Sequence, residues 1–245
     1  MNPYAAPMTA LDALQSTNPI DLLALAGLVL AWLGTGWLTE NPPARRQSVS
    51  VLMNDYRREW MRQFVTRDPR IFDATVLDNL RQGTAFFASA SMIAIGGGVA
   101  LIGNATVVKD LTAQFALDQG TISFELKIFV VLTFLANALL KFVWSNRLFG
   151  YCLIMMAAVP NDPGDPQCYH RAAQAAEVNI TAARNFNRGL RAIYFALGAL
   201  GWLAGPLALL VTTGLSAGIL LRREFASQSR QVIQSASLSE KQPSQ

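Results

Sequence analysis

The sequence predicts an all-α polytopic membrane protein with four transmembrane helices, in which long helices extend into a cytoplasmic helical layer. Three observations lead to this fold class. Apolar residues make up 52% of the 245 positions and charged residues only 15%, which is unusual for a soluble domain. The apolar residues come in long blocks, and about twenty of them cross the hydrocarbon core of a bilayer. Other segments repeat apolar residues at three- and four-residue steps, which predicts amphipathic helices.

Four apolar blocks are long enough to cross a bilayer. They cover residues 20–38, 83–104, 126–146 and 192–221. The first block is not expected to be a cleaved signal, because no Lys or Arg precedes Ile20. It begins instead like a stable helix, with Asn18 as a cap and Pro19 in the first turn. The proline pair at 42–43 ends it.

The last block allows two interpretations, because Gly205 and Pro206 divide residues 192–221 near the middle. The chain could form one long helix kinked at Pro206, or a hairpin that returns to the side from which it came. Non-helical backbone inside the bilayer is costly unless protein covers it, which favours the kinked helix. Residues 1–222 then form a single membrane domain, and the polar segment 223–245 is expected to be disordered.

The distribution of basic residues predicts the orientation. Residues 39–82 carry eight basic residues and residues 145–191 carry five, whereas residues 105–125 carry only Lys109. Basic loops stay in the cytoplasm. The first and third loops are therefore expected inside and the N-terminus outside, with the protein in the inner (plasma) membrane. A kinked last helix would leave the basic start of the tail outside, against this rule, whereas a hairpin would satisfy it.

Four helices are expected in the cytoplasmic layer, over residues 46–66, 69–82, 148–159 and 170–190. The first is rich in arginine, and either it anchors at the membrane surface or its aromatic residues pack within the layer while its arginines form salt bridges. The residues concerned are Trp60, Phe64, Arg57, Arg58 and Arg62. Nucleic-acid binding is not expected, because six acidic residues accompany the eight arginines of residues 39–82.

A candidate polar site is predicted at the inner membrane face. Asn137 and Lys141 fall four residues apart on one face of the third long helix, and Arg147 follows. Lys141 is expected to pair with a carboxylate at the base of the second span, either Asp73 or Asp78. A cation at this depth is costly unless it is paired or close to the membrane edge.

Small residues at four-residue spacing predict close helix packing inside the membrane. They are Ala90, Ala94, Gly98, Gly201, Gly205, Gly214 and Gly218. No metal or cofactor is predicted, since Cys152 and Cys168 do not form a C-x-x-C pair and no catalytic motif is present.

Five segments carry a resemblance to a known family. They are RREWM (57–61), RDPRI (67–71), GTAFFASASMIAIGG (83–97), KFVWSNRLFGYC (141–152) and FNRGLRAIYF (186–195). Together they resemble domain-of-unknown-function family 599, whose members are membrane proteins of bacteria and plants. The resemblance implies a multi-span membrane protein and supplies no reaction, ligand or catalytic residue.

Three functional classes follow from this sequence. The favoured class is an interaction, scaffold or accessory protein that docks other membrane proteins, or a second copy of itself, through its cytoplasmic helices. The second is a small-molecule or lipid-binding protein, with an enzyme as one form, whose site lies at the inner membrane face. The third is an oligomeric transporter or channel. The lipid bilayer is an expected partner in all three, and an enzymatic role is not favoured because no catalytic motif is present.

Overall fold

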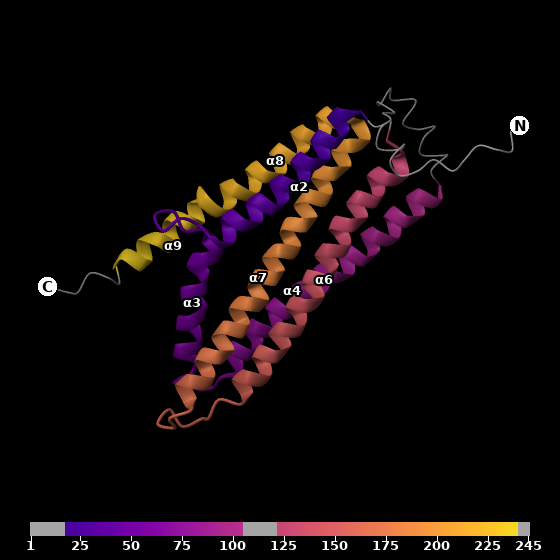
Figure 1. The fold of residues 1–245 in the computed structure, drawn as a ribbon. Helices are drawn as coiled ribbons and strands as arrows, with labels where there is room; N and C mark the ends of the chain where they lie inside the picture. Colours follow the sequence, from indigo (N-terminus) through magenta and orange to yellow (C-terminus); the bar gives the residue numbers. More distant parts are fainter. Residues whose placement is uncertain (1–17, 105–121, 240–245) are drawn as a thin grey trace, which may run out of the picture.

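The computed structural model describes residues 18–104 and 122–239. Within these ranges the chain is helical and contains no strand, so the predicted all-α class is confirmed. The elements are α2 (Pro19–Glu40), α3 (Val49–Phe64), α4 (Ile71–Gly103), α6 (Phe124–Ala157), α7 (Cys168–Leu200), the 3-10 turn η1 (Gly201–Ala204), α8 (Pro206–Phe225) and α9 (Gln228–Ser239) (Figure 1). The expectations for the N-terminal arm and for Lys109 fall on residues outside the described ranges.

Three helices of the described chain, α2, α4 and α6, are long and apolar enough to cross a membrane, judged by length and composition. α4 has 33 residues and α6 has 34. At about 1.5 Å per residue each is about 50 Å long, well beyond a hydrocarbon core of about 30 Å. The helices expected separately at 69–82 and 148–159 are therefore continuous with the spans that they adjoin.

The polar residues before position 148 do not interrupt α6, because α7 and α4 satisfy them. The Ser145 hydroxyl donates to the Ala182 carbonyl of α7 at 2.8 Å. The Asn146 amide donates to the Arg81 carbonyl and to the Thr84 hydroxyl of α4, both at 3.0 Å. α6 thus runs on past the position where the sequence suggested that its span ends.

The prediction of one kinked helix over residues 192–221 is wrong. The chain reverses at η1 and Gly205, and α8 runs back beside α2 toward the end of the bundle where α3 lies (Figure 1). The Ser216 hydroxyl donates to the Tyr194 carbonyl at 3.1 Å, which joins α8 to α7. Gly205 has φ 109°, a conformation that glycine adopts readily and other residues rarely do.

α8 also runs beside α2 over most of its length. At one end, Trp202 Nε1 donates to the buried Asp21 carboxylate at 2.7 Å. Between the two ends, Ala24 and Leu28 of α2 pack with Leu209 of α8 in one buried cluster. The turn between α7 and α8 therefore lies beside the start of α2 and not halfway along the bundle.

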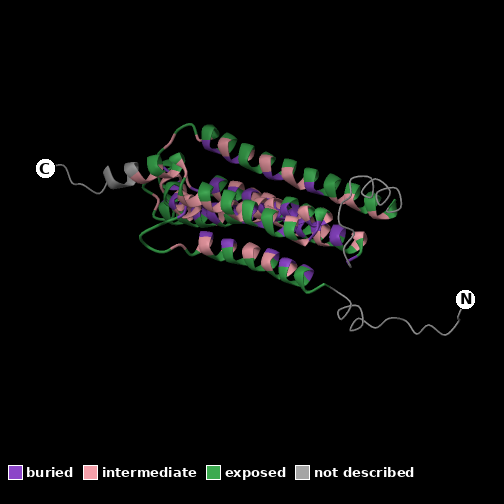
Figure 2. Cartoon of the chain, turned by 90° about the horizontal axis from the view of Figure 1, so that it is seen from above, coloured by how far each residue is buried: buried purple, intermediate pink, exposed green. Residues whose placement is uncertain are grey.

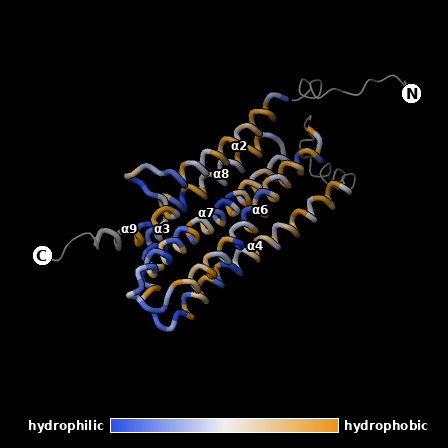
Figure 3. The backbone as a smooth tube through the Cα atoms, turned by 60° about the horizontal axis from the view of Figure 1, so that its bottom comes forward, coloured by the Kyte–Doolittle hydropathy of each residue, from blue (hydrophilic) through white to orange (hydrophobic). Residues whose placement is uncertain are grey.

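The opposite end of the bundle is polar. Hydrophilic residues gather where α3, α9 and the loops lie (Figure 3). We call this region the polar end. Here four helices bury their apolar faces against one another, since Met61 of α3, Leu77 of α4, Phe149 of α6 and Ala172 of α7 share one buried cluster. Figure 2 shows the buried residues of the long helices turned toward their neighbours, with exposed residues on the outer surfaces.

The segment expected to be disordered is helical over α9, which follows α8 after a short break. Arg230 Nε donates to the Gln47 carbonyl at 2.8 Å, so the segment after α8 contacts the loop before α3. Residues 240–245 lie outside the described ranges.

Candidate functional site

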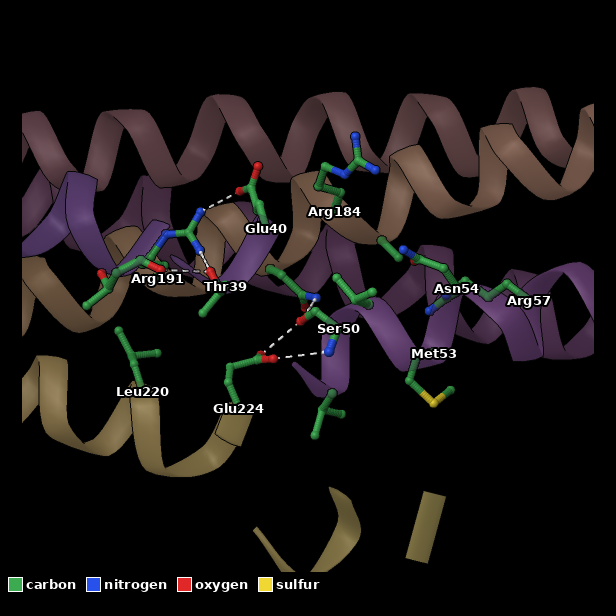
Figure 4. Close-up of a pocket in the computed structure, with 15 residues that line it drawn as sticks. Thr39, Glu40, Ser50, Met53, Asn54, Arg57, Arg184, Arg191, Leu220 and Glu224 are labelled. Atoms are coloured by element: carbon green, nitrogen blue, oxygen red, sulfur yellow. Dashed lines mark hydrogen bonds and ion pairs between the residues drawn. The ribbon is translucent and has the colours of Figure 1, made fainter. Parts of the chain in front are cut away.

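A pocket of about 290 Å³ lies where the long helices meet α3 at the polar end (Figure 4). Four helices supply its walls. The polar lining residues are Thr35, Thr39 and Glu40 of α2, Ser50, Asn54 and Arg57 of α3, Arg184, Asn187 and Arg191 of α7, and Glu224 of α8. We call it the polar pocket.

Hydrogen bonds from two helices fix the start of α3 at this pocket. The Ser48 hydroxyl caps α3 by accepting from Val51 N at 3.2 Å, and it donates to the Thr39 carbonyl at the end of α2 at 2.8 Å. The Glu224 carboxylate accepts from the Ser50 backbone N–H at 3.0 Å and from the Ser50 hydroxyl at 2.8 Å (Figure 4). The end of α8 thereby holds the first turn of α3, where unpaired N–H groups need acceptors.

Arg191 forms one wall of the pocket. Its guanidinium donates to Glu40 Oε1 at 2.8 Å and to the Thr39 hydroxyl at 2.9 Å (Figure 4). Arg188, one turn earlier on α7, also donates to Glu40 Oε1 at 2.8 Å. The Glu40 carboxylate is therefore shared by two arginines, and its charge does not neutralise any other cation of the pocket.

Arg57 lies in a different environment from the arginines around it. Its guanidinium donates to the Asn179 side-chain oxygen, and no carboxylate pairs with it among the residues that the structure describes. Burial lowers the pKa of Arg57, because the charged form loses water that no carboxylate replaces. Arg184, an exposed residue of the same pocket, also forms no ion pair within the described part of the chain.

The other arginines of α3 lie on its outer face. Arg58 pairs with Glu177 at 2.7 Å and with Asp55 at 3.1 Å, and Arg62 pairs with Glu59 at 2.7 Å. The two arginine side chains are 51% and 63% exposed, and such surface pairs contribute little to stability. Trp60 and Phe64 pack on the buried cluster of the polar end, so both lie among helices. Arg57 is the arginine of this run that faces the pocket.

The family comparison covers most of the chain. Residues 23–229 match the model described as "Protein of unknown function, DUF599". The chain belongs to the DUF599 family. The family resemblance drawn from five short segments is thus confirmed, whereas no curated protein and no solved structure matches the chain. Membership of DUF599 assigns no reaction or ligand. The candidate site of this DUF599 protein is therefore identified from the geometry of the polar pocket.

The structure brings together two of the five predicted polar-site residues. Asn137 and Lys141 of α6 line a shallow groove with Trp37 of α2, close to Glu40 and Arg188. Arg147 lies elsewhere on α6, where its Nε donates to the Tyr151 hydroxyl at 2.6 Å.

The predicted ion pair between Lys141 and the second span is wrong. Asp73 is fully buried and accepts from Trp60 Nε1 at 2.6 Å and from Arg67. Asp78 accepts from Arg81, three residues later on the same helix, at 3.2 Å. Both carboxylates thus accept hydrogen bonds from neighbours in α3, α4 and the loop between them, whereas Lys141 lies in the groove formed with α2 and α7.

The small residues chosen by spacing have different environments. A Cβ on Gly98 would meet Leu132 of α6, and one on Gly201 would meet Thr212 of α8, so both allow close helix packing. Gly205 forms the turn. Gly214 and Gly218 have nothing of the described chain within 4 Å of a Cβ. Ala90 and Ala94 are exposed on α4.

Sequence reasoning missed most of the polar pocket. Arg184, Arg188 and Arg191 recur at four and three residues along α7, a spacing that puts them on one face and could have marked it. Glu224 carried no such signal, because its role depends on the return of α8 toward α3.

Proposed function

We propose that this DUF599 protein binds an anionic small molecule or lipid headgroup in the polar pocket, at the inner face of the membrane. The observation that supports this function is the pair of Arg57 and Arg184, which line one pocket without a carboxylate partner in the described chain. The partly buried Arg57 guanidinium is unfavourable without a counter-ion, and a phosphate or carboxylate would accept two parallel hydrogen bonds from an arginine. Arg191, which donates to Glu40, is a third arginine in the lining of the pocket.

The proposal includes an orientation in the membrane. We place the polar end in the cytoplasm and let α7 and α8 cross as a hairpin beside α2, α4 and α6. The basic first and third loops, and the basic end of α8, then lie on one side, as the distribution of Lys and Arg favours. The hairpin is supported by the two ends of α8, one beside Asp21 and the other bonded to Ser50.

The test uses the intact protein, purified in a mild neutral detergent and analysed by native mass spectrometry. We expect an anionic molecule of defined mass to accompany the wild type and to be lost from Arg57→Met and from Arg184→Met. Arg62→Met is the matched control, because Arg62 is an exposed arginine of α3 outside the pocket. Identical bound masses in all four proteins would count against the proposed function.

A second candidate, the docking role favoured by the sequence, has its own observation. Ile71 and Phe72, adjacent at the start of α4, are 71% and 61% exposed. Large apolar side chains exposed together mark interaction surfaces when no lipid covers them. Cross-linking from position 72 in intact membranes should capture a protein partner if this face docks one, and lipid alone if it does not.

A further inference from the structure

A second cavity is lined by residues of α2, α6 and α7. It measures about 370 Å³ and is the groove in which Asn137 and Lys141 lie. We call it the lateral groove. Glu40 and Arg191 line both this groove and the polar pocket, but the remaining walls are different. The lateral groove is therefore a separate candidate binding site.

One wall of the lateral groove is apolar and outward-facing. Leu33 and Trp37 of α2 are 54% and 68% exposed, and Trp32 lies beside them. These residues belong to one of the three helices apolar enough to cross a membrane. In a bilayer, this wall contacts acyl chains, and tryptophan favours the level of the lipid headgroups.

The other wall is cationic. Lys141, Arg188 and Arg191 line the groove with a single carboxylate, Glu40. Both arginines donate to Glu40 at 2.8 Å, so that carboxylate is already engaged. Neither the Lys141 ammonium nor the Asn137 amide has a side-chain hydrogen-bond partner within residues 18–104 and 122–239. Two donors one helical turn apart thus remain for a ligand.

A missing side chain shapes the groove. A Cβ on Gly36 would lie 3.3 Å from the Arg191 guanidinium, so Gly36 lets that cation rest against the backbone of α2. The guanidinium then sits beside the apolar wall of Leu33 and Trp37 without leaving Glu40. The groove consequently presents positive charge directly next to an apolar surface.

The position along the bundle matches a headgroup. α2 ends at Glu40, and Asn41 and two prolines follow, so the groove lies where this membrane helix stops. Lys141 precedes the polar pair Asn146 and Arg147 by five and six residues on α6, which is about 8 Å along a helix. Basic pockets between membrane helices at this level bind anionic headgroups.

We propose that the lateral groove binds the phosphate of an anionic membrane phospholipid, with Lys141 and Asn137 donating to it and an acyl chain lying along Trp32, Leu33 and Trp37. The phosphate chemistry could also be met by a free anion from water. The exposed apolar wall favours the lipid, because an acyl chain can cover this wall and a water-borne phosphate cannot. This inference does not depend on the ligand of the polar pocket.

The experiment titrates the intact protein, purified in a neutral detergent, with short-chain phosphatidylglycerol, with phosphatidylcholine of the same chain length, and with inorganic phosphate. We expect phosphatidylglycerol to bind at least about tenfold more tightly than phosphatidylcholine, because both lipids carry the phosphate but the choline of phosphatidylcholine brings a positive charge beside Lys141, Arg188 and Arg191. Lys141→Met should remove this preference and Lys141→Arg should keep it. Arg147→Met removes the same charge from the same helix outside the groove and should bind like the wild type.

Three results would overturn the proposal. They are equal binding of the two lipids by the wild type, an unchanged preference in Lys141→Met, and competition by inorganic phosphate at the same concentration as the lipid, which would indicate a water-borne anion. If Lys141→Met does not fold, as judged by its elution and circular dichroism, Asn137→Leu gives the same test. Arg57→Met separates the two sites, because it should lose the anion of the polar pocket and keep the lipid preference.

Discussion

Arg57 and Arg58 are adjacent on α3 but lie in different environments. Arg58 is on the solvent-exposed face, where its hydrogen bond to Glu177 raises the pKa of its guanidinium. Arg57 faces the helices behind α3, and burial lowers its pKa. The apolar period of residues 49–64 predicts an amphipathic helix, and this helix is observed. The period does not reveal that the inner face opens on a pocket, because that depends on residues of α7 and α8.

The aromatic anchor of the same helix gives a residue-scale prediction. Trp60→Ala should lower the free energy of unfolding by about 2–4 kcal/mol, because the ring packs on the buried cluster and its N–H bonds the buried Asp73. Trp60→Phe keeps the ring contact and loses the N–H, and should cost about 1–2 kcal/mol. Denaturation in detergent measures both. Unchanged melting of Trp60→Ala would mean that the ring contacts only lipid headgroups.

The polar-site prediction also belongs to this scale. Helical spacing put Asn137 and Lys141 on one face, and both line the lateral groove. Sequence could not identify the side chains opposite them, because the contact with α2 joins residues about a hundred positions apart. The charge of Asp73 suggested a partner for Lys141, but Trp60 and Arg67, much closer in the chain, bond that carboxylate instead.

At the scale of elements, the packing of α6 on α7 depends on a glycine that spacing rules overlooked. A Cβ on Gly189 would lie 2.6–2.9 Å from the Phe142 ring. Gly214 and Gly218 fit the four-residue rule, but a Cβ on either would meet nothing of the described chain within 4 Å, whereas Gly189 has no such repeat. Close approach is set by the facing side chain, and a spacing rule within one helix does not identify that side chain.

Gly189→Ala should therefore destabilise the protein by about 1–3 kcal/mol, the usual cost of overpacking a core. Gly150→Ala, on the same pair of helices but with nothing within 4 Å of its Cβ, should be neutral or stabilising by up to about 1 kcal/mol. Thermal melting of the two variants in one detergent compares them. Equal melting temperatures would mean that the Phe142 ring moves aside at no cost.

The reversal between α7 and α8 rests on one backbone conformation. Gly205→Ala should cost about 1–3 kcal/mol, because φ 109° is strained for alanine. Gly97→Ala is the helical control, since it meets nothing within 4 Å. The sequence marked the break at Gly205 and Pro206 correctly. A turn inside the bilayer would be costly. However, α7 begins at Cys168 and turns only beside the start of α2, at the far end of the bundle.

At the scale of the whole molecule, the hairpin predicts on which side of the membrane each loop lies. Reporter fusions at residues 75, 165 and 235 should all report the cytoplasm, because α8 returns the chain to the end where α3 begins. A fusion at residue 115 should report the opposite side. A report from residue 235 on the side opposite residue 75 would exclude the hairpin as a membrane-crossing unit.

The hydrogen bond between Glu224 and Ser50 joins the end of α8 to the first turn of α3. A ribosome makes Ser50 long before Glu224, and domains fold in the order in which they emerge. The nascent chain can place α2, α4 and α6 in the membrane while the first turn of α3 still lacks its carboxylate acceptor. The polar pocket is complete only after Leu220 and Glu224 have been made, so a chain truncated before α8 lacks one wall of the site.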